Sequence, residues 1–423
     1  MSEAFPEVRT ESLQLARPDG TPQRGFLLRV VSGADAGKAL VVDGSQARPL
    51  HVGTSRSADL VLRDPAVSRR HLTLDLGPGG LRVRDAGSTN GLRLGSHRVL
   101  DAFLEGGETL RLGQTTLQVE ALGTPARMVV AASAGVGRIV GASAAMRRIY
   151  PVLGDLARSK APLLLEGEAG VGKELFAETI HERGGPERPF VVFQAYGKDD
   201  ARAEAELFGE GGAWAEATGG TLLVDEPCDL SPALQLRLLR ALEVKSPLRL
   251  MATSRRSVDG EVEHGRLRED LALELSTSRL EIPPLRDRDG DVALLAAHFY
   301  RSLDDERTLP ALTVRRFEAY GWPGNVRELR AAVRRFHATG ADALEPRETF
   351  AETGHQEDPT TLYRRVLASD LALPQARAVI TDDFDRRYVE RVLARHAGNV
   401  TRAAASSGLA RRYFQILKSK RGL

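Results

Sequence analysis

Two stretches in the middle of the sequence carry residue types and spacings suited to phosphate chemistry. The first follows the apolar run Leu163–Leu165 and precedes a helical pattern. Backbone N–H groups of such a loop and of the next helix can hold phosphate, while its lysine reaches the outer oxygens. We predict that the nucleotide-binding residues here are Gly167, Glu168, Ala169, Gly170, Val171, Gly172, Lys173 and Glu174, which have the G-x4-G-K spacing of a P-loop.

The second stretch is an apolar strand that ends in two carboxylates. Thr221–Val224 are followed by Asp225 and Glu226, about 50 residues after the loop. In such a pair the Asp holds Mg²⁺ through water and the Glu activates the attacking water. The two stretches together predict an ATP and Mg²⁺ site, with Asp225 and Glu226 as catalytic residues and Asp225 as the metal-binding one.

Length and composition limit the class of protein. The 423 residues suggest two to four domains, and 59 Lys+Arg against 57 Asp+Glu give a formal charge of only +2, so any nucleic-acid binding must be local. The single Cys228 excludes an internal disulfide and a zinc site built from cysteines. No run of about 18 apolar residues and no signal-peptide pattern occurs, so we expect a cytoplasmic protein that binds no membrane.

The hydrophobic pattern changes along the chain and predicts a multidomain fold. Alternating apolar residues separated by glycine-rich turns predict an all-β sandwich over 24–122, and a small, alanine-rich stretch predicts a flexible connector over 123–137. Apolar strands alternating with helices predict an α/β nucleotide-binding domain over 138–283, followed by a helical region over 284–350. A polar linker is expected over 351–375, and an all-α domain over 376–423.

The carboxy-terminal segment is strongly basic. From Arg386 to Leu423 ten basic residues stand against the single acid Glu390, and Gly408 falls between two short helical patterns. Two helices joined by such a turn predict a helix-turn-helix whose second helix can enter a major groove. The segment resembles the Fis-type DNA-binding domain of bacterial enhancer-binding activators, which implies dimers on inverted repeats. Candidate DNA-binding residues are Arg402, Arg411, Arg412 and Lys418 for phosphates, and Gln415 with one arginine for base edges.

The central region is similar to the AAA+ domain of sigma-54-dependent activators over about 139–350. The motifs that carry the resemblance are the P-loop, which has G-K-E in that family too, Glu206–Gly209, Gly219–Glu226, Arg268–Leu271, Pro283–Arg286 and Trp322–Leu329. The resemblance implies that Arg268 is a finger reaching the γ-phosphate of a neighbouring subunit, that Arg327 is the lid sensor and that Ser254 stands at the first sensor position. A site completed across subunits implies a homo-oligomer, from a dimer up to a hexameric ring.

Several positions depart from that family. Its G-A-F-T-G-A loop, which contacts sigma-54, is missing between Gly209 and Gly219, where only Gly212–Trp214 resembles a remnant. Ser254 replaces an Asn, Gln194 replaces another Asn, and Glu274 stands where a second arginine is expected. We therefore predict ATP binding with weak or absent turnover, and contact with sigma-54 RNA polymerase becomes doubtful.

The predicted sandwich resembles the forkhead-associated (FHA) domain. Its S-R-x-H motif at 68–71 and S-T-N-G motif at 88–91 carry the resemblance, which implies a phosphothreonine-binding site. We expect Ser68 and Arg69 to hold the phosphate through charge-assisted hydrogen bonds and Asn90 to hold the ligand backbone. Thr89 would shape the loop, and Arg56 would compensate for Thr54, which stands where the family often has arginine. The alternative is a sandwich that binds an unphosphorylated partner.

Together these patterns predict a DNA-binding transcriptional regulator of the sigma-54-interacting type. Its input would be a phosphothreonine-containing protein from a Ser/Thr kinase pathway, and its AAA+ domain would bind ATP. Two alternatives stay open. One is an active ATPase that remodels sigma-54 RNA polymerase, and the other is a DNA-binding repressor or scaffold without a motor.

Overall fold

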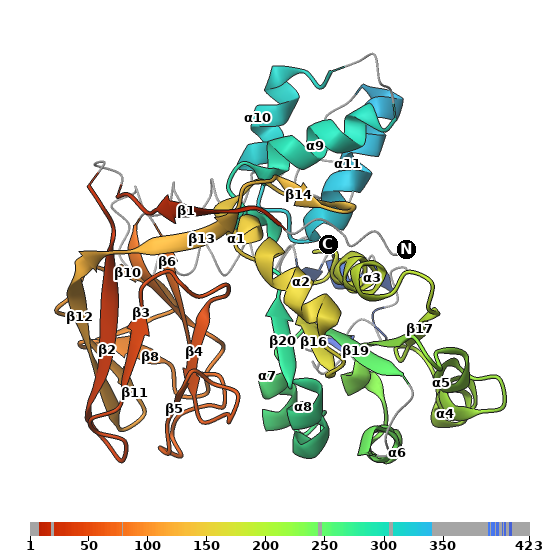
Figure 1. The fold of residues 1–423 in the computed structure, drawn as a ribbon, viewed down its shortest axis with the longest axis horizontal. Helices are drawn as coiled ribbons and strands as arrows, with labels where there is room; N and C mark the ends of the chain where they lie inside the picture. The colour runs from red at the N-terminus through yellow and green to blue at the C-terminus, as the bar shows by residue number, and fades with distance from the viewer. Residues whose placement is uncertain are drawn as a thin grey trace. The chain divides into compact units, whose positions relative to one another are not determined.

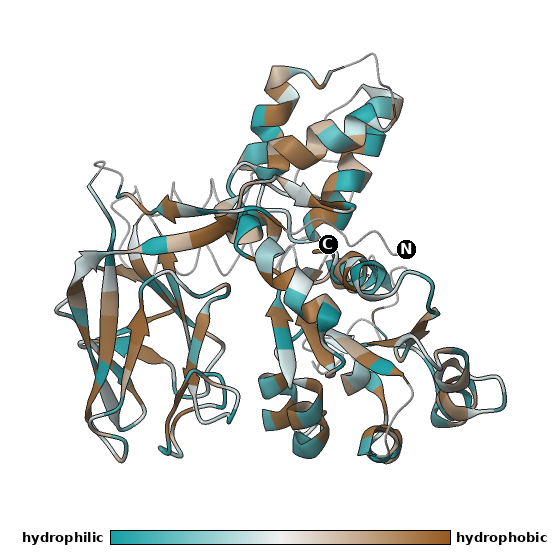
Figure 2. Ribbon diagram, viewed as in Figure 1, coloured by the Kyte–Doolittle hydropathy of each residue, from teal (hydrophilic) through white to brown (hydrophobic). Residues whose placement is uncertain are grey.

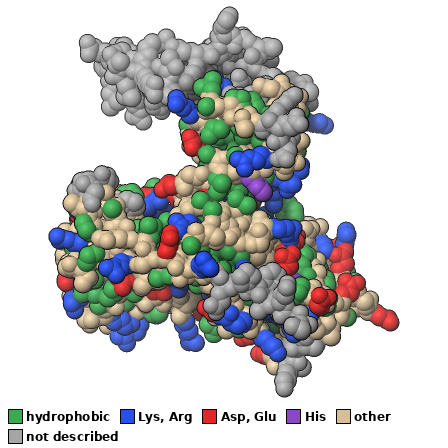
Figure 3. All heavy atoms as spheres, turned by 45° about the horizontal axis from the view of Figure 1, so that its top comes forward, with side chains coloured by type: hydrophobic (Ala, Val, Ile, Leu, Met, Phe, Trp, Pro, Cys, Tyr) green, Lys and Arg blue, Asp and Glu red, His purple; other side chains and the backbone are tan. Residues whose placement is uncertain are grey.

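The structure is a computed structural model that divides into two compact units, 1–345 and 346–423. It describes residues 8–17, 21–77, 79–243, 248–303 and 308–340, with isolated residues of the second unit: 388–389, 391–393, 395–396, 400, 402 and 406–407. Within these residues no helix is both long enough and apolar enough to span a bilayer. On the face in Figure 3, basic and acidic side chains are interspersed, in keeping with the small net charge of +2.

The amino-terminal region is a β-sandwich, as predicted. One sheet has the order β10-β7-β6-β4-β5 and the other β3-β2-β12-β11-β8-β9. The strands are β2 (Arg24–Ser32), β3 (Ala39–Val42), β4 (Leu50–Gly53), β5 (Leu60–Val61), β6 (Leu72–Gly77), β7 (Gly80–Asp85), β8 (Leu92–Leu94), β9 (His97–Val99), β10 (Asp101–Leu104), β11 (Thr109–Leu112) and β12 (Thr115–Pro125). Leu72, Leu74 and Leu76 alternate with polar neighbours and are all buried in the core between the sheets. The same alternation is visible along the strands in Figure 2.

The segment expected as a flexible connector is ordered, so that expectation is wrong. After β12, Arg127–Ala131 forms β13, which pairs antiparallel with β1 (Thr10–Gln14). Met128, Val130 and Ala131 are buried. The alanine-rich composition concealed this strand, in which exposed and buried residues alternate from Arg127 to Val130. The strand is completed by pairing with β1, which is distant in the sequence. Burial of its apolar side chains requires that ordered pairing. The short strands β14 (Gly135–Val136) and β15 (Ile139–Val140) follow as a hairpin.

The central domain has the predicted parallel sheet, with the order β17-β18-β19-β16-β20. Its strands are β16 (Leu163–Glu166), β17 (Phe190–Gln194), β18 (Thr221–Asp225), β19 (Arg249–Ser254) and β20 (Ser278–Glu281). The helices are α1 (Ala144–Arg147), α2 (Tyr150–Arg158), α3 (Lys173–Gly184), α4 (Asp200–Phe208), α5 (Ala213–Glu216), the 3-10 turn η1 (Pro227–Asp229), α6 (Pro232–Glu243), α7 (Val258–Glu263) and α8 (Glu269–Leu275). Leu163, Leu164 and Leu165 are fully buried because helices cover both faces of the sheet (Figure 1).

The helical region after the sheet also follows its predicted pattern. The 3-10 turn η2 (Leu285–Asp287) precedes α9 (Asp291–Arg301), α10 (Ala311–Ala319) and α11 (Asn325–Thr339). Pro310 caps α10, and Trp322 lies in the break before α11, fully buried between Phe317 and Tyr320. The three helices pack on one another through a small apolar core of their own (Figure 1).

Candidate functional site

The P-loop connects β16 to α3 at the carboxyl end of the parallel sheet. Gly167, Gly170 and Gly172 all have positive φ, at 151°, 81° and 104°, a range that glycine tolerates best. A Cβ at Gly170 would lie 2.2 Å from the carbonyl oxygen of Gly324 before α11. Glycine is therefore needed both for the turn and for the close approach of the helical region.

Lys173, the first residue of α3, turns back over this loop. Its Nζ donates to the carbonyl oxygens of Gly167 at 2.8 Å and Glu168 at 3.2 Å. Burial lowers the pKa of Lys173, an effect opposed by the nearby Asp225 and Glu226. The ammonium thus lies among neutral oxygens, with two carboxylates close by across the site.

Asp225 is the last residue of β18, which lies between β17 and β19 in the sheet, and Glu226 follows it directly. Glu226 adopts the left-handed φ of 58°, and its Oε1 accepts a hydrogen bond of 2.9 Å from the backbone N–H of Arg255. Burial raises the pKa of Glu226 to about 6, which suits a group that accepts a proton near neutral pH. Asp225 accepts a hydrogen bond from the hydroxyl of Thr253 on β19.

Ser254, at the end of β19, is fully buried. Its hydroxyl donates to the carbonyl oxygen of Arg256 at 2.7 Å, while its own carbonyl accepts from the N–H of Gly167 at 3.1 Å. The side chain therefore closes a local turn, and only its backbone contacts the P-loop. Gln194 ends β17 opposite Asp225 and is exposed, as is Glu174 in the first turn of α3.

Arg327 lies on α11, where its N–H donates to the carbonyl oxygen of Gly170 at 3.2 Å. Its side chain is exposed. Two further residues fix this contact and were missed as individual site residues, although both fall within quoted motifs. Asn325, buried with φ of 53°, donates to Glu168 and Ala169 at 3.1 Å each. Arg286 forms a bidentate ion pair with Glu168 at 2.8 and 2.5 Å, which lowers the pKa of Glu168.

Arg268 caps the amino end of α8. Its guanidinium is partly exposed and pairs with Asp270, with hydrogen bonds of 3.0 and 2.6 Å. The structure does not bring it to the P-loop of its own chain through any contact among the described residues.

In the sandwich, four of the predicted phosphothreonine residues, Ser68, Arg69, Thr89 and Asn90, lie on two neighbouring loops, and Arg56 lies on a third loop, between β4 and β5. Ser68 and Thr89 are joined by hydrogen bonds, from the N–H of Thr89 to the Ser68 hydroxyl at 3.1 Å and between the hydroxyls at 3.4 Å. His71 is fully buried and lies between these loops, with Nδ1 accepting from the N–H of Ser68 at 3.1 Å. Asn90 donates to the carbonyl oxygen of Ala66 at 2.8 Å and is exposed.

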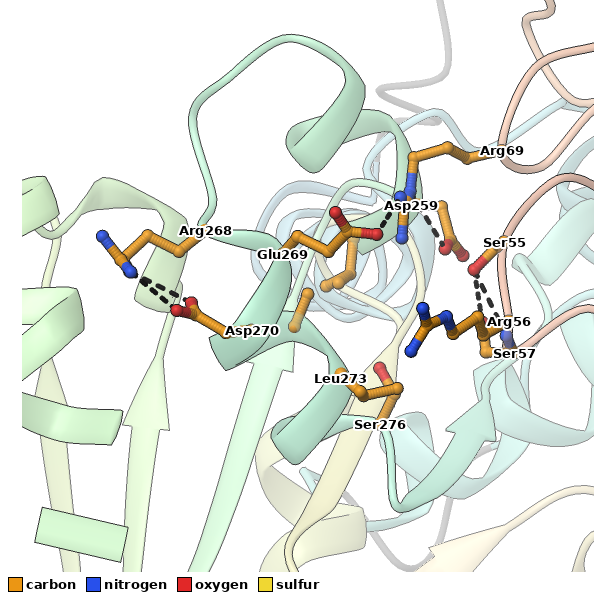
Figure 4. A pocket seen from close by; sticks show the side chains of 12 residues that line it. Ser55, Arg56, Ser57, Arg69, Asp259, Arg268, Glu269, Asp270, Leu273 and Ser276 are labelled. Atoms are coloured by element: carbon orange, nitrogen blue, oxygen red, sulfur yellow. Dashed lines mark hydrogen bonds and ion pairs between the residues drawn. The ribbon is translucent and has the colours of Figure 1, made fainter. Parts of the chain in front are cut away.

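Arg69 and Arg56 lie at the edge of a pocket of about 580 Å³ that α7 and α8 also line. Figure 4 shows Arg69 reaching toward Glu269 on α8 and toward Asp259 on α7. The first is an ion pair at 2.7 Å and the second lies at 3.9 Å. Arg268 lines the same pocket.

The segment where a sigma-54 contact loop would stand is short. Residues 209–212 are all that separate α4 from α5. Trp214 on α5 packs against Phe208 on α4, with ring centroids 5.8 Å apart. The structure therefore shows a compact turn here, in agreement with the missing loop of the sequence.

The residues present fit an ATP phosphate chain. Three positive-φ glycines, a helix amino end and the Lys173 ammonium converge on one side, and the Asp225–Glu226 pair faces them. Among the residues that the structure describes, no group of three or more His, Cys, Asp or Glu side chains is arranged to hold a metal ion. A role for Asp225 in holding Mg²⁺ through water thus depends on the nucleotide to supply further oxygens.

Of the predicted DNA-binding residues, only Arg402 falls within the described part of the chain, where it is helical and exposed. The other four, Arg411, Arg412, Gln415 and Lys418, lie outside the described residues. The helix-turn-helix itself remains a prediction.

Comparisons with known proteins give the chain its family. The Sigma-54 interaction domain matches residues 140–285, the AAA+ ATPase lid domain matches 286–361, and the cytoplasmic domain of the inner membrane component of T3SS matches 29–123. The solved structure of NtrX from Brucella abortus with ATP is 27% identical, covers 69% of this chain and 71% of its own, and has a TM-score of 0.47. An FHA domain from Arabidopsis thaliana is 26% identical, covers 25% of this chain and 91% of its own, and has a TM-score of 0.23.

The response regulator protein PilR of Pseudomonas aeruginosa is 32% identical over 320 residues, which cover 68% of this chain and 70% of PilR. The match spans about two thirds of each protein, and the matched Sigma-54 interaction domain at 140–285 includes the P-loop and the Asp225–Glu226 pair. The chain belongs to the family of sigma-54-dependent transcriptional regulators.

Proposed function

We propose that the protein is a DNA-binding transcriptional regulator that binds ATP at the P-loop with weak or absent turnover. Its carboxy-terminal helices would bind an operator, and its sandwich would sense a phosphothreonine-containing protein. The observation that carries the proposal is the contrast within the central domain. Lys173, Asp225 and Glu226 converge on one site, while only residues 209–212 connect α4 to α5 where a sigma-54 contact loop would stand.

Three features favour nucleotide binding over rapid hydrolysis. The Ser254 hydroxyl, at the first sensor position, is used in a hydrogen bond to Arg256. Glu274 on α8 adds negative charge near the proposed subunit contact, where a γ-phosphate would be repelled. Gln194, at the end of β17, stands where the family has an Asn that couples to the Walker B glutamate. Each would weaken stabilisation of the transition-state charge.

The test is steady-state phosphate release by the purified full chain, with ATP binding measured in parallel. We expect the wild type to bind ATP roughly 10–100-fold more tightly than Lys173→Ala and to release phosphate at a rate close to that of the variant. Vigorous release by the wild type that Lys173→Ala removes would contradict the proposal of a degenerate motor. Lys160→Ala, an exposed lysine before β16, is the matched control.

A working ATPase that remodels sigma-54 RNA polymerase is the second candidate. The burial that raises the pKa of Glu226 to about 6 favours it, because such a carboxylate is a competent base. Sigma-54-dependent reporter activity that is lost in Lys173→Ala would select this candidate. A repressor or scaffold without a motor would show operator binding and oligomer size that do not change with ATP.

A further inference from the structure

The predicted phosphothreonine site of the sandwich faces acidic side chains of the nucleotide-binding domain. Arg69 donates from Nη1 to Glu269 on α8 at 2.7 Å, and the hydroxyl of Thr89 donates to Glu263 on α7 at 3.2 Å. The donors of Arg69 and Thr89 that would bind the oxygens of a phosphate are therefore already hydrogen-bonded to carboxylate oxygens. We call these two contacts the latch.

A second cluster attaches the sandwich more firmly. Its members are His51 and Arg70 from the sandwich with Glu166, Arg279 and Glu281 from the sheet. Arg70 forms an ion pair with Glu281 at 3.0 Å and lies 3.8 Å from Glu166, which also pairs with Arg279. The side chains of Arg70, Arg279 and Glu166 are at most 9% exposed. We call this cluster the anchor.

The two clusters differ in how easily water and ions can replace them. The side chain of Glu269 is 66% exposed, and exposed ion pairs contribute little because water and salt compete. Breaking a buried pair instead leaves a desolvated charge without a partner. The latch can thus open while the anchor holds the sandwich in place.

The charges across the contact are complementary well beyond the latch. Arg82 and Arg84 of β7 both reach Asp287 of η2, at 3.1 and 2.9 Å. Four arginines of the sandwich thus pair with carboxylates outside it: Arg69 and Arg70 with the nucleotide-binding domain, and Arg82 and Arg84 with the helical region that follows it. In one further pair the charges are reversed: Arg148 of the nucleotide-binding domain pairs with Asp75 of the sandwich at 2.7 Å. This face of the sandwich is suited to an acidic surface.

We propose that Glu263 and Glu269 are an internal ligand of the sandwich, which a phosphothreonine peptide displaces from Arg69 and Thr89. The proposal rests on the phosphothreonine-sensing function proposed above. A phosphothreonine carries up to two negative charges and three acceptor oxygens, whereas each glutamate offers one charge. The pocket of about 580 Å³ beside Glu269 gives the peptide access, and Arg56 on its wall adds a further positive charge.

Displacement would also change the surroundings of Arg268. This residue precedes Glu269 directly, caps α8 and lines the same pocket. While the latch is closed, Arg69 of the sandwich is ion-paired with Glu269 at the amino end of α8. Opening the latch would expose this end, so phosphopeptide binding and a contact of Arg268 with a second subunit would favour each other.

The experiment compares the full chain with the double variant Glu263→Gln and Glu269→Gln, which keeps the shape and removes both charges. The control is Glu318→Gln, the same change at an exposed glutamate on α10. Amide hydrogen exchange of 258–275 reports the latch. Fluorescence anisotropy with a degenerate phosphothreonine peptide library, at low salt, reports the binding site. We expect faster exchange and roughly tenfold tighter peptide binding for the double variant only.

The outcomes separate the latch from the sensing function. If exchange and peptide affinity of the double variant equal those of the wild type and of Glu318→Gln, the internal ligand is overturned. If amide exchange of 258–275 rises in the double variant but neither protein binds phosphopeptide, the latch exists and the phosphothreonine-sensing function is wrong. The proposed competition between the glutamates and a phosphopeptide is then overturned as well. Loss of binding on adding Arg69→Ala to the double variant would confirm that the peptide uses the site that the latch covers.

Discussion

The protein has two candidate phosphate sites, and they differ in what their cations already contact. At the P-loop, Lys173 donates to two neutral carbonyl oxygens at 2.8 and 3.2 Å. In the sandwich, Arg69 donates to the Glu269 carboxylate at 2.7 Å. An arriving phosphate replaces dipoles in the first case and a full charge in the second.

The difference indicates different roles for the two ligands. Although Asp225 and Glu226 lie near Lys173, its ammonium donates to neutral carbonyl oxygens, so a phosphate can bind there without displacing a carboxylate of another domain. A site whose cation faces a carboxylate from elsewhere in the chain links binding to release of that carboxylate. Nucleotide binding would then stabilise the central domain, and phosphopeptide binding would change a contact.

The largest effect should come from breaking the anchor. Arg70→Met leaves Glu281 and Glu166 with one cation fewer in a largely buried cluster, so we expect the free energy of unfolding to fall by about 2–3 kcal/mol. Urea unfolding of the full chain measures it. Arg93→Met, an exposed arginine on β8, is the control and should change little. An Arg70→Met protein as stable as the control would mean that the sandwich is not held by this cluster.

The next effect separates the two phosphate sites. Lys173→Ala removes a charge-assisted contact to phosphate worth about 1.5–3 kcal/mol, so ATP affinity should fall roughly 10–100-fold. Arg69→Ala should leave ATP affinity unchanged. Titration with a fluorescent ATP analogue measures both. A similar loss in both variants would contradict the assignment of two independent sites.

Much of the fold could be predicted because its signals are local. Leu72, Leu74 and Leu76 alternate with polar residues, and the P-loop glycines mark a turn between strand and helix. β13 was missed because its partner, β1, lies more than 100 residues away in the sequence. A short, alanine-rich strand has no strong signal of its own without that pairing.

The candidate site was predictable in its residues and not in its contacts. Asp225, Glu226 and Lys173 could be named from motifs, since each motif fixes a residue at a strand or helix end. The ion pairs of Arg69 with Glu269 and of Arg286 with Glu168 join residues 200 and 118 positions apart. Neither glutamate differs in type from the many exposed ones, so only the fold reveals its partner.

The smallest effect is a pH dependence of the anchor. His51 is buried beside Arg70, Glu281 and the Thr73 hydroxyl, with Arg279 nearby. Burial first, and then the positive charge of Arg70, lower its pKa below the usual 6.5, although Glu281 opposes this. The unfolded chain therefore binds a proton that the folded protein does not, so the contribution of His51 is present above about pH 6.5 and falls as the pH drops below it.

We expect the wild type to lose roughly 1 kcal/mol of stability between about pH 7.5 and about pH 5.5 through His51. His51→Gln keeps a polar side chain that does not titrate, so its urea-unfolding curves should change less over that range. Since His71 is also buried with a lowered pKa, part of the dependence will persist in the variant. The anchor is therefore tested by the difference between the two proteins, and identical pH profiles would mean that His51 does not enter the contact as a neutral group.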